Sequence, residues 1–133
     1  MTEDIFSKGI GNKEGMKSLL AKPVVVLGKV AESVLGKKDS KNAGKEVGKK
    51  LVLMCKHPDR EEPIKISSMV FIVGKTIKSS TIWLNIDADG MIEKGSHVAI
   101  LLEKYQAKTV NELEGKTLQT ELDENKFLAI KSY

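Results

Sequence analysis

Two Gly-Lys-Thr triplets, at residues 74–76 and 115–117, look like catalytic motifs in this 133-residue chain. A phosphate-binding loop needs a second glycine five residues before its Gly-Lys pair, so that backbone N–H groups can surround the phosphates. Those two positions hold Met69 and Val110. The segments that follow the triplets have a strand pattern, so no helix N-terminus would face the phosphates. The triplets therefore predict turns between strands.

A second motif resembles a calcium loop. Asn85, Asp87 and Asp89 alternate before Gly90, as in the first half of an EF-hand, but the twelfth position holds Ser96 where a bidentate Glu is needed. Aspartate side chains in such a segment commonly hydrogen-bond the local backbone. We therefore predict a β-turn here and no metal site.

The chain has one cysteine, Cys55, and two histidines, His57 and His97. Cys-x-His is not a structural zinc spacing, and no third group is evident that would orient a cysteine–histidine nucleophile pair. Cys55 lies in an apolar run and is predicted to be a small buried hydrophobe. We expect a non-enzymatic protein without a metal or a cofactor.

Length and composition predict one soluble globular domain, with 41% hydrophobic and 30% charged residues. We found no apolar run near the roughly 18 to 20 residues that span a bilayer, and no signal-peptide pattern. A single cysteine fits a reducing compartment. The expected location is the cytoplasm, without membrane contact.

Positive charge is concentrated at the start of the chain. Residues 1–50 hold 11 of the 22 Lys and Arg but 6 of the 18 Asp and Glu, which gives +5 there and −1 in residues 51–133. Such asymmetry is typical of proteins that contact nucleic acid or membranes. We predict that residues 1–47 form a basic Gly/Lys-rich arm, and that residues 48–133 form the folded domain.

Within the arm we expect short elements only. Pro23–Leu27 has the β-branched composition of a short strand. Val30, Val34 and Leu35 are spaced as one helical stripe. The chain from Lys37 to Lys50 contains two apolar residues, and we predict a mobile loop.

The folded domain shows three predicted strands, one helix and two further strands. The first three strands are expected at 51–55, 64–73 and 81–86, and the last two at 117–122 and 127–133, joined as a hairpin. Ser96 is the predicted helix N-cap, because apolar residues follow at helical spacing. The pattern of Thr109 and Glu112 predicts a capping box for a following single turn.

This order of elements resembles the five-stranded OB-fold barrel of single-stranded nucleic-acid-binding proteins, in which a helix commonly lies between the third and fourth strands. The resemblance implies a mainly β (α+β) fold: a small antiparallel OB-like barrel preceded by the basic arm. It also implies binding of single-stranded DNA or RNA through lysine–phosphate contacts and a few stacked aromatic residues.

We expect twelve cationic side chains to make the phosphate contacts: Lys37, Lys38, Lys41, Lys45, Lys49, Lys50, Lys56, Arg60, Lys65, Lys75, Lys78 and Lys126. The stacking candidates are Trp83 and Phe127. Since aromatic residues make up 5% of the chain, phosphate contacts should dominate and affinity should fall steeply with salt.

An alternative interpretation stays open. The chain could be a structural or adaptor subunit that binds protein partners, or a second copy of itself, through the apolar segments 64–73 or 81–86.

Overall fold

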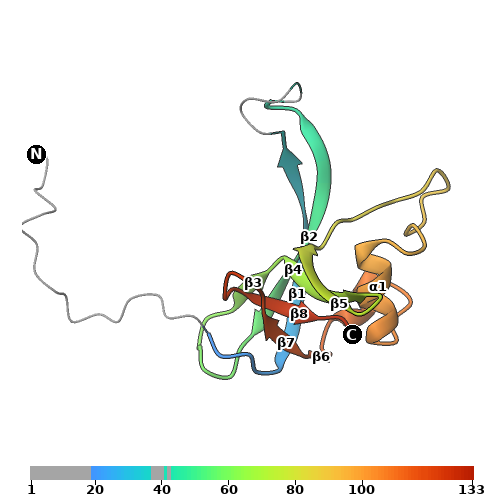
Figure 1. The fold of residues 1–133 in the computed structure, drawn as a ribbon. Helices are drawn as coiled ribbons and strands as arrows, with labels where there is room; N and C mark the ends of the chain where they lie inside the picture. The colour runs from blue at the N-terminus through green and yellow to red at the C-terminus, as the bar shows by residue number, and fades with distance from the viewer. Residues whose placement is uncertain (1–18, 37–40, 42) are drawn as a thin grey trace, which may run out of the picture.

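The computed structural model describes residues 19–36, 41 and 43–133, which form a mainly β fold with one α-helix (Figure 1). The elements are β1 (Val24–Leu35), β2 (Glu46–Lys56), β3 (Ile64–Ile66), β4 (Ser68–Val73), β5 (Thr76–Thr81), α1 (His97–Lys104), the 3-10 helix η2 (Val110–Leu113), β6 (Thr117–Leu118), β7 (Thr120–Leu122) and β8 (Leu128–Lys131). No helix in this described part of the chain is long and apolar enough to cross a membrane.

The first sheet has the strand order β3-β2-β1-β6 and is built on the long hairpin of β1 and β2. These two strands pair antiparallel from Val25 with Lys56 to Leu35 with Glu46, with irregularities near both ends. At the start of β1 the side chains alternate, because Val24 and Val26 are buried whereas Val25 and Leu27 are exposed. The far end of the hairpin projects away from the rest of the molecule (Figure 1).

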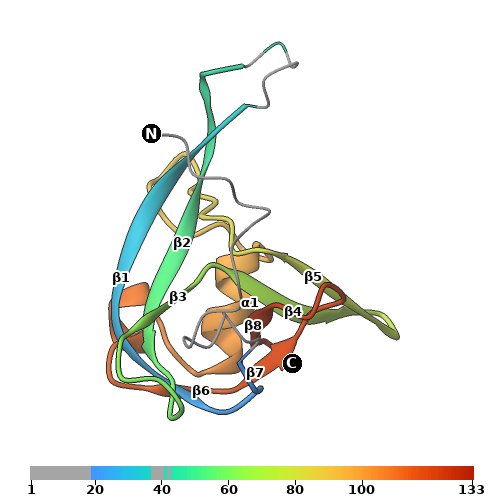
Figure 2. The same ribbon diagram turned by 90° about the vertical axis from the view of Figure 1, so that its left-hand side faces the viewer.

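The second sheet has the order β5-β4-β8-β7, in which β4 and β8 run parallel and the other pairs antiparallel. One residue, Ser67, separates β3 from β4, and one residue, Gln119, separates β6 from β7. Each of these two chain segments therefore pairs in both sheets. The result is a strongly curved, barrel-like arrangement (Figure 2).

The core lies between the curved sheets and α1. Ser96 caps the helix as predicted, because its Oγ accepts a hydrogen bond from the Ala99 N–H at 3.3 Å. Val98, Leu101 and Leu102 on the helix join Val24, Val26, Leu51, Leu53, Ile66, Met69, Ile82 and Ile130 in one apolar cluster. Burial of this cluster supplies the main favourable free energy of folding.

Tyr105 ties the end of the helix to the sheets. Its hydroxyl donates to the Lys131 carbonyl at 2.6 Å and accepts from the Gln119 N–H at 2.9 Å. The predicted capping box is not formed, because Thr109 makes no side-chain cap and the Glu112 carboxylate accepts from the N–H of Lys108, one residue before the N-cap. The terminal hairpin is confirmed as β7 and β8.

The described residues form eight strands, whereas the predicted barrel has five, and three predicted elements are wrong. The helical stripe of Val30, Val34 and Leu35 is part of β1, since pairing with β2 continues through those residues. The loop expected from Lys37 to Lys50 becomes strand at Glu46. Residues 1–18, 37–40 and 42 lie outside the described residues.

The strand predicted at 81–86 is the third error. Strand β5 ends at Thr81, and the next residues make one isolated antiparallel bridge to β2, between Trp83 and Lys50. In this bridge the Ile82 carbonyl accepts from the Leu51 N–H, and the Leu84 N–H donates to the Lys49 carbonyl. The strand Thr76–Thr81 was not predicted because its composition is polar. It pairs with β4 across the Gly74-Lys75 turn. That turn is as predicted, with Gly74 at φ +63°.

Candidate nucleic-acid interface

The turn between β7 and β8 presents the most exposed aromatic side chain in the described part of the chain. Asp123 organises this turn, because its Oδ1 accepts hydrogen bonds from the N–H groups of Asn125 and Phe127, both at 2.9 Å. The Asp123 N–H also donates to the Phe127 carbonyl at 2.9 Å. Phe127 is 68% exposed on this fixed turn, so an apolar ring is held in contact with solvent.

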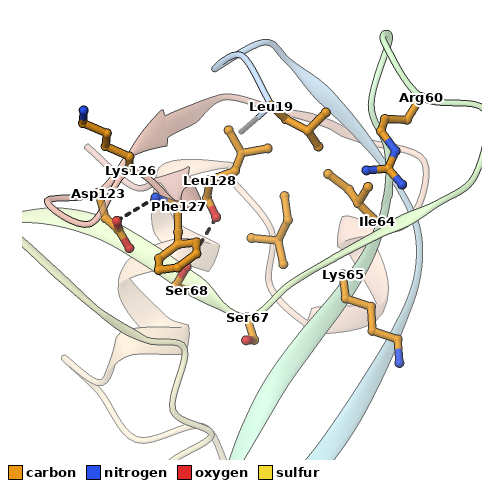
Figure 3. A pocket seen from close by; sticks show the side chains of 11 residues that line it. Leu19, Arg60, Ile64, Lys65, Ser67, Ser68, Asp123, Lys126, Phe127 and Leu128 are labelled. Atoms are coloured by element: carbon orange, nitrogen blue, oxygen red, sulfur yellow. Dashed lines mark hydrogen bonds between the residues drawn. The ribbon is translucent and has the colours of Figure 1, made fainter. Parts of the chain in front are cut away.

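Phe127 borders a pocket of about 540 Å³, which we call the Phe127 pocket (Figure 3). Its lining comes from four separate segments of the chain: Leu19, Arg60, Ile64, Lys65, Ile66, Ser67, Ser68, Asp123, Lys126, Phe127 and Leu128. The volume is within the usual range of sites for small organic groups, about 300 to 1,000 Å³. Its apolar surface could receive a flat aromatic ring such as a nucleobase.

Three of the predicted cations surround this pocket. Arg60 extends over Ile64, whereas Lys65 and Lys126 point outward at two ends of the lining (Figure 3). None of the three forms a salt bridge with a described residue. The one carboxylate in the lining, Asp123, is occupied by backbone N–H groups. The pocket therefore combines an apolar interior with a cationic rim.

His57 is fully buried and precedes Arg60 of the pocket lining by three residues. Its Nδ1 accepts a hydrogen bond from the Asp59 N–H at 3.0 Å, and its Nε2 is 2.8 Å from the Leu20 carbonyl oxygen. The ring thus joins the chain before β1 to the turn after β2. Sequence reasoning considered His57 only as a partner for Cys55 and missed this role.

Cys55 is buried, as predicted, and burial raises the pKa of its thiol to about 12. A thiol in such surroundings is not a nucleophile at neutral pH, because the thiolate is the reactive form. Within the described ranges, no group of three His, Cys, Asp or Glu side chains is placed to hold a metal ion. The Asp87 Oδ1 accepts from the N–H groups of Asp89 and Met91, which confirms the predicted turn.

The remaining predicted cations do not join the Phe127 pocket. Lys41, Lys45, Lys49 and Lys50 lie along the β1–β2 hairpin, where Lys50 is 3.8 Å from the Glu32 carboxylate. Lys37 and Lys38 lie outside the described residues. The Lys56 ammonium donates to the carbonyls of His57 and Arg60, so it stabilises a turn of the backbone.

Lys75 and Lys78 lie on the β4–β5 hairpin, and Lys78 borders a smaller hollow with Asp123 and Glu124. Trp83, the other predicted stacking residue, is half-buried beside β2, where it forms a bridge with Lys50 and packs against Gly48. The structure thus brings together Arg60, Lys65, Lys126 and Phe127 of the predicted set. It adds Leu19, Ile64 and Leu128, which the sequence pattern did not single out.

Comparison with models of protein families, with curated proteins and with solved structures found no significant match to this chain.

Proposed function

We propose that this chain is a non-enzymatic protein that binds single-stranded nucleic acid at the Phe127 pocket. The observation that carries the proposal is the convergence of one exposed aromatic ring and three cationic side chains on a single apolar pocket. Stacking on an aromatic side chain contributes about 1 to 3 kcal/mol per base, and lysine or arginine contacts add attraction to the phosphates.

The architecture favours single strands over duplexes. A base can enter an apolar pocket only when its face is free, and in a duplex both faces are covered by stacking. Arg60, Lys65 and Lys126 would meet the phosphates on either side of that base. Exposed lysines on the β1–β2 hairpin, among them Lys41, Lys45 and Lys49, would extend the contact along the strand.

Strand pairing supports an OB-like barrel as the scaffold of this site. Counting β3 with β4 and β6 with β7, five chain segments pair in the circular order β1, β2, β3/β4, β8, β7/β6 and back to β1. The helix α1 lies between the third and fourth of these segments along the chain, which is where OB-fold barrels commonly carry one. Strand β5 is an addition to this plan.

The decisive experiment is a binding titration of a labelled oligothymidine strand and a duplex of equal length, followed by fluorescence anisotropy at several salt concentrations. We expect tighter binding of the single strand and a linear fall of log affinity with log salt. Replacing Phe127 by Ala should weaken binding by about 5- to 150-fold, the equivalent of one lost stacking contact. The matched control is Ile77→Ala, which removes a similarly exposed apolar side chain outside the pocket. Absence of binding at about 50 mM salt would refute the proposal.

A protein-binding role is the second candidate, and one observation favours it. Ile72 and Ile77 are cross-strand partners on β4 and β5 and are 46% and 55% exposed. Four residues of the apolar segment 64–73 are buried, namely Ile66, Met69, Val70 and Phe71, so the contact surface would be this hairpin rather than the whole segment. Light scattering tests self-association: a monomer at all concentrations would exclude a stable homo-oligomer, whereas a dimer abolished by Ile77→Lys would support it.

A further inference from the structure

The protonation state of His57 is defined by its two hydrogen-bond partners. A backbone N–H can only donate and a backbone carbonyl can only accept. The Nδ1 that accepts from Asp59 must therefore lack a proton, and the Nε2 beside the Leu20 carbonyl must carry one. In this arrangement the buried imidazole is neutral.

These two hydrogen bonds hold two neighbouring parts of the lining of the Phe127 pocket (Figure 3). Leu20 directly follows Leu19, which lines the pocket. Asp59 directly precedes Arg60, whose side chain also lines the pocket. The turn is further closed by the Arg60 N–H, which donates to the His57 carbonyl at 3.2 Å. One buried ring thus fixes the position of the apolar Leu19 segment relative to the turn that carries Arg60.

We propose that His57 is a positioning residue of the Phe127 pocket, and that the pocket is assembled only while the imidazole is neutral, so that ligand binding is lost on acidification. The inference rests on the proposed function for its binding readout. A protonated Nδ1 is a hydrogen-bond donor, and it would face the Asp59 N–H, which is also a donor. The bond that positions the Arg60 turn would break.

The charged groups around the ring do not offer an alternative that keeps the pocket. The Asp59 Oδ2 is 4.0 Å from Nδ1, beyond hydrogen-bond distance, and the Oδ1 of the same carboxylate is held by the Lys22 ammonium at 3.0 Å. The Lys56 ammonium donates to the carbonyls of His57 and Arg60, so two cationic residues belong to this turn. Rotation of a protonated Nδ1 toward Asp59 would itself move the turn that carries Arg60.

The test uses the fact that the full chain contains two histidines. Binding of oligothymidine is measured from pH 8 to pH 5, the interval in which histidine ordinarily changes charge. We expect the wild-type affinity to fall by about tenfold, since the hydrogen bond that positions the Arg60 turn is lost. His57→Gln removes the titrating group and keeps a donor at the end of the side chain, so it should bind more weakly at pH 8 and show a flat profile. His97→Gln, on helix α1 against Phe71, should retain the wild-type profile.

A flat wild-type profile, or a pH dependence that survives in His57→Gln, would overturn the inference. Far-UV circular dichroism should stay constant over the same interval, and global unfolding there would also overturn it.

A readout independent of nucleic acid separates this inference from the proposed function. In ¹⁵N NMR at pH 8, His57 should show the Nε2–H tautomer, and the Leu19 methyl signals should shift as the pH is lowered to 5. If oligothymidine does not bind at pH 8, the proposed function fails. The NMR measurement still decides the role of His57, since an Nδ1–H tautomer or unmoved Leu19 signals would refute it.

Discussion

The Asp123 carboxylate accepts a hydrogen bond from the Phe127 N–H at 2.9 Å, and this contact fixes the turn that exposes the Phe127 ring. The same oxygen also accepts from the Asn125 N–H, so one side chain closes the turn twice. The carboxylate therefore contributes to the proposed site by shaping the backbone, and its charge is partly offset by backbone dipoles.

This relationship predicts how the site responds to mutation of Asp123. Asp123→Ala should lower oligothymidine affinity by about 3- to 10-fold, because the turn loses two hydrogen bonds and the Phe127 ring loses its fixed position. Asp123→Asn keeps a side-chain oxygen in the same place and should bind at least as well as wild type, since it also removes a negative charge from the pocket. Equal weakening in both variants would show that the carboxylate acts through its charge.

The proposed contacts between lysines and phosphates predict how mutation changes the salt dependence of binding. Lys65→Ala should reduce the slope of log affinity against log salt by about 0.7, the value for one phosphate contact on a single strand. Lys104→Ala is the control, because Lys104 is exposed at the end of α1 and does not line the pocket. Anisotropy titrations between about 50 and 300 mM salt measure both slopes. An unchanged slope for Lys65→Ala would remove Lys65 from the proposed interface.

Gly48 and Trp83 predict a packing effect away from the pocket. A Cβ at Gly48 would lie 3.1 Å from Cζ3 of the Trp83 ring, closer than ordinary van der Waals contact. Gly48→Ala should therefore displace the indole and shift its fluorescence emission. Gly28→Ala on β1 is a matched control, because nothing lies within 4 Å of its Cβ position. In the control we expect an unchanged emission maximum and an unfolding free energy equal to or up to about 1 kcal/mol above wild type. Identical spectra for both variants would contradict the packing observed at Gly48.

Cys55 predicts a pH dependence of stability on the alkaline side. The pKa of the thiol is about 12 in the folded state against 9.0 for the unperturbed group, so the unfolded chain releases its proton first. The contribution to the free energy of unfolding is complete below pH 9 and is lost progressively as the pH rises toward 12. Chemical denaturation at a series of pH values should show a steeper alkaline decline in wild type than in Cys55→Ala.

A labelling experiment checks the same burial at neutral pH. Cys55 should resist a thiol reagent while the protein is folded and react at once in denaturant. Rapid modification of the native protein would show that the segment around Cys55 opens readily.

Local signals in the sequence were sufficient for the elements that depend on neighbouring residues. Ser96 and the apolar spacing after it predicted α1, and the Asp-rich segments predicted the turns at 87–91 and 123–127. In each case a side chain hydrogen-bonds backbone groups within four residues, so the interaction is encoded where it occurs.

Strand identity depended on contacts between distant segments. The sequence pattern of residues 24–35 fits one long strand as well as a short strand followed by a helical stripe. Pairing with β2 makes the whole segment a strand. Residues 76–81 form a strand because they pair with the edge of β4. The residues after Thr81 are more apolar, but they do not continue this strand. β-Sheet preference is largely a matter of such context.

The sequence by itself determined which residue types this protein can use: cations in excess near its start and few aromatic rings. Only the tertiary structure decided which of them meet. Arg60, Lys65 and Phe127 come from a turn, a strand and a second turn, and curvature of the sheets brings them around one pocket. Trp83 lies instead beside Gly48, and His57 joins the chain before β1 to the turn after β2. The physical reason is that barrel closure and strand register act over the whole chain, whereas sequence patterns report interactions over a few residues.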